Sequence, residues 1–144
     1  MWRSKIQTLT KSAKFADPAS FSAIERIENT FETTVPNELR DLLCETDGVE
    51  GEYGLGLVWN CARILKDNLQ FRSSLKFAEL YMPFQPLLFF GDAGNGDQFA
   101  FAIRNGKILS SDIYVWNHEN DSRTWVAPSL EKYLEWWLIG KLKV

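Results

Sequence analysis

The chain has 144 residues, of which 45% are hydrophobic and 24% charged, and its formal net charge is −3. This composition excludes a disordered chain, and the length is sufficient to bury a core without disulfides or metals. No apolar run approaches the roughly 20 residues that a bilayer-spanning helix needs. The basic first residues lack the apolar centre of a secretory signal, and two cysteines are too few for a disulfide framework. We therefore expect a single cytoplasmic domain over residues 1–144.

The charge is distributed unevenly along the chain. Residues 1–14 contain no acidic residue and four basic ones, which are Arg3, Lys5, Lys11 and Lys14. The rest of the chain has 12 of the 16 basic residues and all 19 acidic ones, so its formal charge is −7. Such a body repels nucleic acid and attracts basic partners. We interpret residues 1–16 as a basic N-terminal segment, and favour a solvated tail over a nucleic-acid arm.

The first two predicted elements are amphipathic helices. One covers residues 17–31, has Asp17 or Ser20 as its cap, and carries an apolar stripe at helical spacing, formed by Phe21, Ile24, Ile27 and Phe31. Pro36 begins the second helix, and Asp47-Gly48 ends it, because glycine tolerates a left-handed C-terminal cap. The buried side of this second helix consists of Leu39, Leu42 and Leu43.

The residue pattern in the middle of the chain predicts a strand, a helix and a further strand. Residues 55–59 form a short apolar strand. Residues 61–74 form an amphipathic helix with Ile64, Leu65 and Leu69 on its buried side. Pro83 and Pro86 then break any helix, and the apolar run over residues 87–90 is typical of a buried strand.

The last third of the chain carries the clearest local pattern. Phe99, Phe101 and Ile103 alternate with small or polar residues, and Asn105-Gly106 supplies a two-residue hairpin turn. Residues 112–118 form another strand. The last helix covers residues 127–140, with an apolar stripe of Leu130, Tyr133, Leu134, Trp137 and Leu138. Helices at both ends of a set of hairpin-connected strands predict an α+β fold with a largely antiparallel sheet.

A glycine-rich stretch, FFGDAGNGDQFAF, runs from Phe89 to Phe101. It lacks the lysine of a Walker phosphate loop and the spacing of the dinucleotide fingerprint. Ligand positions of a calcium loop counted from Asp92 fall on glycines, which have no side-chain oxygen. We predict a structural turn in which Asp92 and Asp97 accept hydrogen bonds from turn amides, with partner contact as an additional role.

The sequence contains no catalytic constellation. Its single histidine, His118, has no serine or cysteine nucleophile motif to serve. An enzyme that uses His118 and Glu119 as general acid and base is the least favoured interpretation. The two cysteines are too isolated for a zinc site, so we expect neither a metal nor a cofactor.

Two clusters are candidates for partner binding. The first contains acids and no base, and consists of Asp41, Glu45, Asp47, Glu50 and Glu52. A solvated helix end and an anionic patch for a basic partner are equally favoured interpretations of this cluster. The second is aromatic, and in it Trp136 departs from the apolar stripe of its helix, which is typical of an interface anchor. The further candidates are Asp92, Asp97, Trp116 and Glu119.

In their order and spacing these pieces resemble the SUKH superfamily, whose members include yeast cell-wall regulators. The early motif, a helix, a turn with Val35-Pro36 and a helix ending in glycine, begins at Ile24. The middle motif is the glycine-rich turn with Gly96-Asp97. The late motif joins Val115-Trp116 and His118-Glu119 to the stretch over residues 126–130. The resemblance extends to about Leu138.

The resemblance implies an α+β fold with a central mixed sheet flanked by helices, and no catalytic residues. Bacterial members of the superfamily serve as immunity proteins, or antitoxins. The resemblance therefore implies binding of a cognate protein toxin, often a nuclease, with occlusion of its active site or substrate groove. The alternative is a non-catalytic regulatory interaction module, as in eukaryotic relatives. We expect no direct contact with nucleic acid and none with a membrane.

Overall fold

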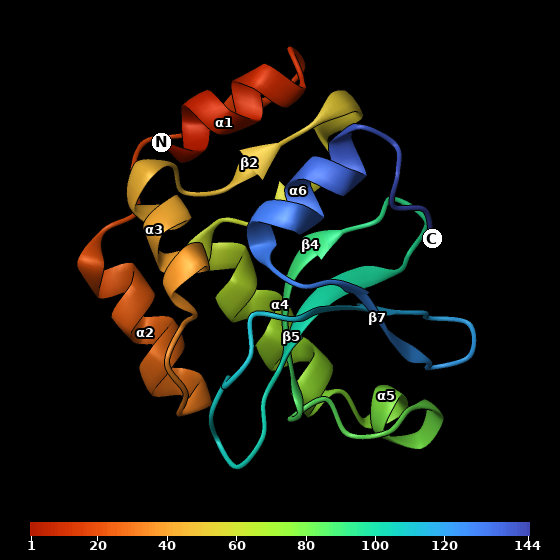
Figure 1. Ribbon diagram of the computed structural model, residues 1–144. Coiled ribbons are helices and arrows are strands. Elements are labelled where there is room, and N and C mark those ends of the chain that lie inside the picture. Colours follow the sequence, from red (N-terminus) through yellow and green to blue (C-terminus); the bar gives the residue numbers. More distant parts are fainter.

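Two antiparallel sheets with flanking helices make up the computed structural model, which describes residues 1–144 (Figure 1). The smaller sheet has the strand order β1-β2-β3, formed by Lys14–Phe15, Val49–Glu50 and Gly56–Val58. The larger sheet has the order β4-β5-β6-β7, formed by Leu87–Asp92, Gln98–Ala102, Ile113–Trp116 and Arg123–Ala127. The predicted α+β class is confirmed, and because every strand pair is antiparallel, neither sheet is mixed.

The helices are distributed along the whole chain. They are α1 (Trp2–Leu9), α2 (Phe21–Phe31), α3 (Asn37–Glu45), the 3₁₀-helix η1 (Glu52–Gly54), α4 (Cys61–Ser73), α5 (Leu75–Leu80) and α6 (Leu130–Leu138). Four of them begin at a side chain that accepts a hydrogen bond from a first-turn amide, and these caps are Ser20, Asn60, Ser74 and Ser129. Ser20 is therefore the cap of α2, and Asp17 is not.

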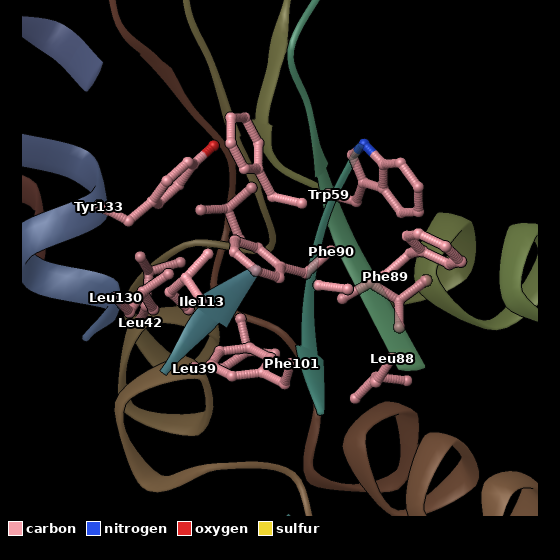
Figure 2. Packing of buried hydrophobic residues seen from close by; sticks show 14 of the residues in the cluster. Leu39, Leu42, Trp59, Leu88, Phe89, Phe90, Phe101, Ile113, Leu130 and Tyr133 are labelled. Carbon is pink, nitrogen blue, oxygen red and sulfur yellow. The ribbon is translucent and has the colours of Figure 1, made fainter. Parts of the chain in front are cut away.

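β4 is buried on both faces of the larger sheet, which explains its continuous apolar run. On one face Phe90 packs against Phe101 and Tyr133, with ring centroids 4.8 and 5.3 Å apart. Figure 2 shows this cluster extending to side chains of α3 and α6. On the other face the ring of Phe89 packs against two aromatic rings. The ring of Phe71 from α4 lies 5.0 Å from it between centroids, and that of Trp116 from β6 lies 5.7 Å from it. A strand covered on both faces shows no polar alternation.

The two sheets meet where β3 passes β4. The amide of Trp59 donates to the carbonyl oxygen of Phe90 at 2.7 Å. Gly91 permits this approach, because a Cβ on it would lie only 2.6 Å from the carbonyl oxygen of Leu57. The hydroxyl of Tyr133 donates to the same Leu57 oxygen at 2.8 Å, so α6 is anchored at this junction.

The N-terminal segment differs from the predicted solvated tail, because residues 2–9 form α1. Trp2 and Ile6 lie one turn apart and are buried among the core residues. Arg3 and Lys5, which lie between Trp2 and Ile6, hid this short apolar stripe from the sequence pattern. α1 packs against α3 and α6, so the segment is part of the folded body.

Other differences concern helix ends and helix faces. α3 ends at Glu45 with an extended Thr46, and Gly48, at φ 93°, lies too far along to be its cap. A Cβ on Gly48 would lie 2.8 Å from the amide nitrogen of Asn60, so this glycine serves a close backbone approach. Phe21 and Leu69, predicted to be buried, are 72% and 44% exposed. The elements α5 and β7 were not predicted.

Candidate partner-binding site

A protruding turn connects β2 to β3, and we call residues Glu50–Gly54 the Tyr53 turn. The amide of Gly51 donates to the carbonyl oxygen of Leu55 at 2.8 Å and closes it. Tyr53 has a left-handed backbone, φ 59° and ψ 25°, and its side chain is fully exposed. Glu50 and Glu52 are also exposed. The turn therefore presents an exposed aromatic ring together with two exposed carboxylates.

A cavity of about 350 Å³ adjoins the Tyr53 turn and reaches from β1 to the start of α4. The guanidinium carbon of Arg63 lies 4.1 Å from the ring centroid of Trp59, and both residues line the cavity. Glu50 and Asp47 add carboxylates to its wall, and Lys14 of β1 adds an ammonium. The cavity is thus lined by charges of both signs.

Arg63 is held by two aspartates. It donates to both carboxylate oxygens of Asp92, at 2.7 and 2.9 Å, and its Nε donates to Asp67 at 3.0 Å. Desolvation lowers the pKa of Arg63, but the hydrogen bonds to Asp92 and Asp67 raise that pKa by more, so it lies above its ordinary value. The carboxylate of Asp92 is therefore engaged in an ion pair within the protein.

The acidic cluster predicted from the sequence is divided by the fold. Glu45 faces α1 and accepts from the Met1 ammonium, at 2.8 Å, and from the amide of Trp2, at 2.9 Å. Desolvation raises the pKa of Glu45, but these hydrogen bonds hold it below its ordinary value. Asp47 accepts from the amide of Cys61 at 2.8 Å and so supports the start of α4.

The other three members of that cluster are exposed. Glu52 accepts a long hydrogen bond, 3.3 Å, from the hydroxyl of Ser12. Asp41 and Glu50 form neither a side-chain hydrogen bond nor an ion pair. The structure thus gathers Asp47, Glu50 and Glu52 around the Tyr53 turn and its cavity, while Asp41 lies on α3.

The glycine-rich turn is structural, but its aspartates are used differently than predicted. Asp97 is buried, and its Oδ1 lies 2.6 Å from Nδ1 of His118 and 3.1 Å from the His118 amide. The turn amides have other partners, since Asp97 N donates to the side chain of Asn95 and Ala93 N to the carbonyl oxygen of Asp97. Gly96 lies under the imidazole, and a Cβ there would lie 2.8 Å from Cε1 of His118.

The tryptophans of the last thirty residues differ in exposure. Trp116 is buried and donates to Asp121 at 2.8 Å. Trp136 is half-buried, with the ammonium of Lys141 4.6 Å from its ring centroid. Trp125, at 48%, is the exposed tryptophan. Sequence reasoning missed Tyr53, although two flanking glycines in a polar stretch indicate a surface turn.

The remaining candidate, Glu119, is exposed and does not pair with His118, whose ring is turned to Asp97. No group of three or more His, Cys, Asp or Glu side chains is arranged to hold a metal ion. None of the helices has the length and apolar character required to cross a bilayer.

Comparison with known proteins identifies the family. A family model, SUKH_6, described as SMI1-KNR4 cell-wall, matches residues 22–134. No curated protein matches the chain. The matched region includes the Tyr53 turn and most of the residues that line its cavity, whereas α1 and β1, whose Lys14 and Phe15 also line the cavity, precede it. Because the match covers well over half of the chain, the protein belongs to the SMI1-KNR4 group of the SUKH superfamily.

Proposed function

We propose that this protein is an immunity protein that binds a cognate toxin, with a basic nuclease domain as the partner, and occludes its active site or substrate groove. The observation that carries the proposal is the Tyr53 turn, in which a fully exposed tyrosine follows the exposed Glu50 and Glu52. Family membership supports a protein-binding role for the protein.

Tyrosine is among the residues that dominate binding energy at interfaces, because a large ring is buried at a small cost in side-chain entropy. The left-handed backbone of Tyr53 costs about 1–3 kcal/mol, and such strained residues concentrate at functional sites. The closed turn holds Tyr53 in this conformation in the free protein, so the ring is already in place for a partner.

The surrounding carboxylates suit a basic partner. Asp41, Glu50 and Glu52 are not neutralised by ion pairs within the protein. A nuclease presents a basic substrate groove, and complementary charge raises association rates above the roughly 10⁵–10⁶ M⁻¹s⁻¹ of uncharged partners. A standard interface of about 800 Å² on each partner accommodates the turn and the adjoining cavity.

Co-expression with the toxin domain encoded immediately upstream tests the proposal. We expect co-purification and rescue of growth, both weakened by Tyr53→Ala and by the double change Glu50→Lys with Glu52→Lys. The matched controls are Phe21→Ala, an exposed aromatic on α2, and Glu25→Lys with Glu79→Lys, exposed acids elsewhere. We expect at least a tenfold loss of affinity for Tyr53→Ala, the size typical of an interface hot spot. Wild-type affinity for both turn variants would refute this binding site.

A regulatory interaction module is the second candidate function. The description of the matching family, which refers to cell-wall proteins, favours it. In that case no toxin domain is encoded beside this protein, and expression of the upstream domain causes no killing for the protein to relieve.

A further inference from the structure

A second surface lies between α2 and α4, and we call it the α2–α4 groove. Its volume is about 620 Å³. We propose that the α2–α4 groove binds an acidic, amphipathic helical segment of a partner protein. The groove shares only Asp47 with the cavity beside the Tyr53 turn, so the proposal is independent of the proposed toxin-binding face.

The floor of the groove is apolar. Leu65 and Leu69 follow Cys61 at intervals of four residues on α4, which places all three on one stripe. The exposure of this stripe increases toward the end of the helix, because Cys61 is buried, Leu65 is half-buried and Leu69 is 44% exposed. α4 also meets the core through Ile64 and Asn68. The apolar stripe therefore continues beyond the buried Cys61 to Leu65 and Leu69, which this chain covers only in part.

The dimensions of this line suit a helix. Leu69 follows Ala62 by seven positions, or about 10 Å at 1.5 Å per residue, which is close to two helical turns. Apolar anchors at positions i, i+4 and i+7 of a bound helix have this reach. Ala23 of α2 and Ala62 of α4 are small, so they let a partner backbone approach closely.

The rim of the groove selects the charge of the partner. Arg26 lies on α2 and Lys66 lies on α4, so each wall of the groove carries one cation. Both are exposed, and neither forms an ion pair or a side-chain hydrogen bond. The one acid of the groove, Asp47, is engaged by the amide of Cys61. Carboxylates of a bound segment would pair with both cations, whereas a basic segment would meet them with like charge.

Fluorescence anisotropy of two labelled peptides tests this inference on the full chain. Each peptide has about 14 residues, enough for four turns, with leucine at helical spacing. One carries glutamate at the other positions and the second carries lysine. We expect the acidic peptide to bind at least tenfold more tightly than the basic one, although the protein is itself acidic. We also expect its affinity to fall steeply with added salt.

Variants locate the binding. Arg26→Glu with Lys66→Glu should weaken the acidic peptide about tenfold or more, while Lys76→Glu with Lys143→Glu, exposed cations outside the groove, should not. Leu69→Ser should weaken it about fivefold, and Leu75→Ser, an exposed leucine on α5, should leave it unchanged. All six positions are exposed, so an unchanged urea midpoint will show that each variant is folded. Absent binding of the acidic peptide, or equal losses in groove and control variants, would overturn the inference.

Discussion

Arg63 and Asp92 form a two-pronged ion pair, with N–O distances of 2.7 and 2.9 Å, that joins α4 to the end of β4. Gly56 makes room for it, because a Cβ there would lie 2.9 Å from Asp92 and 3.0 Å from Arg63. The pair also holds the guanidinium over Trp59, in the wall of the cavity beside the Tyr53 turn. It thereby fixes the shape of the proposed partner-binding surface.

Changing Asp92 should destabilise the protein more than changing Asp67. Asp92→Asn removes one of two parallel charge-assisted hydrogen bonds, whereas Asp67→Asn leaves an oxygen that can accept the single bond within α4 and removes only its charge. Because Arg63 is 39% exposed, solvent screening limits the first loss to about 1 kcal/mol and the second to about 0.4 kcal/mol. Urea unfolding followed by tryptophan fluorescence measures both. A larger loss for Asp67→Asn would contradict the assigned role of the pair.

Asn68 should be essential to stability. Its buried amide donates to the carbonyl oxygens of Ile64 and Phe89, at 2.7 and 2.9 Å, and accepts from the amide of Phe89 at 2.8 Å. Asn68→Ala leaves the buried amide and carbonyl of Phe89 without their side-chain partner, and we expect a loss of about 3 kcal/mol or more. Gln70→Ala, at an exposed position of the same helix, is the control and should change the free energy of unfolding by less than about 0.5 kcal/mol.

Lowering the pH should remove the contribution of Asp121 to the free energy of unfolding. Burial raises the pKa of this carboxyl, but hydrogen bonds from Met82 N and Trp116 Nε1, with Arg123 close by, hold it below the ordinary value of 3.8. A depressed folded-state pKa means that the contribution is present above pH 3.8 and is lost as the pH falls from there through the folded-state pKa.

The comparison of the wild type with Asp121→Asn measures this contribution. We expect the variant to be less stable by about 1–2 kcal/mol near neutral pH, because hydrogen bonds to a charged group weaken when the charge is removed. The difference between the two urea midpoints should shrink as the pH is lowered from about 4 toward 2. A difference that stays constant into strong acid would show that the charge of Asp121 does not stabilise the fold.

The two thiols should differ sharply in reactivity. Burial, and next the neighbouring Asp47, raise the pKa of the Cys61 thiol to about 12, whereas Cys44 is exposed. We expect iodoacetamide to add a single carbamidomethyl group to the native protein and two in urea, as read by intact mass. Cys44→Ser should take up none while folded. Native labelling of that variant at the unfolded rate would show that Cys61 is accessible.

Local signals predicted much of the fold. Helical spacing predicted the buried leucines of α3, all of which are less than 1% exposed. The Asn105-Gly106 turn was also confirmed, with φ of 51° and 74° and paired backbone hydrogen bonds between Arg104 and Lys107. Both features depend on residues within a few positions of one another, so a single stretch of sequence contains the whole signal.

The candidate site depended on contacts between distant segments. The sequence by itself determined that Asp92 and Asp97 stand in a glycine-rich turn between two strands, and that no phosphate or calcium motif is present there. Only the tertiary structure decided the partners of these two residues. Asp92 pairs with Arg63, 29 residues away, and Asp97 pairs with His118, 21 residues away. The tertiary structure likewise left Tyr53 exposed. Hydrophobic periodicity records which face of an element is buried, whereas the partner of a polar side chain depends on which distant segment packs beside it.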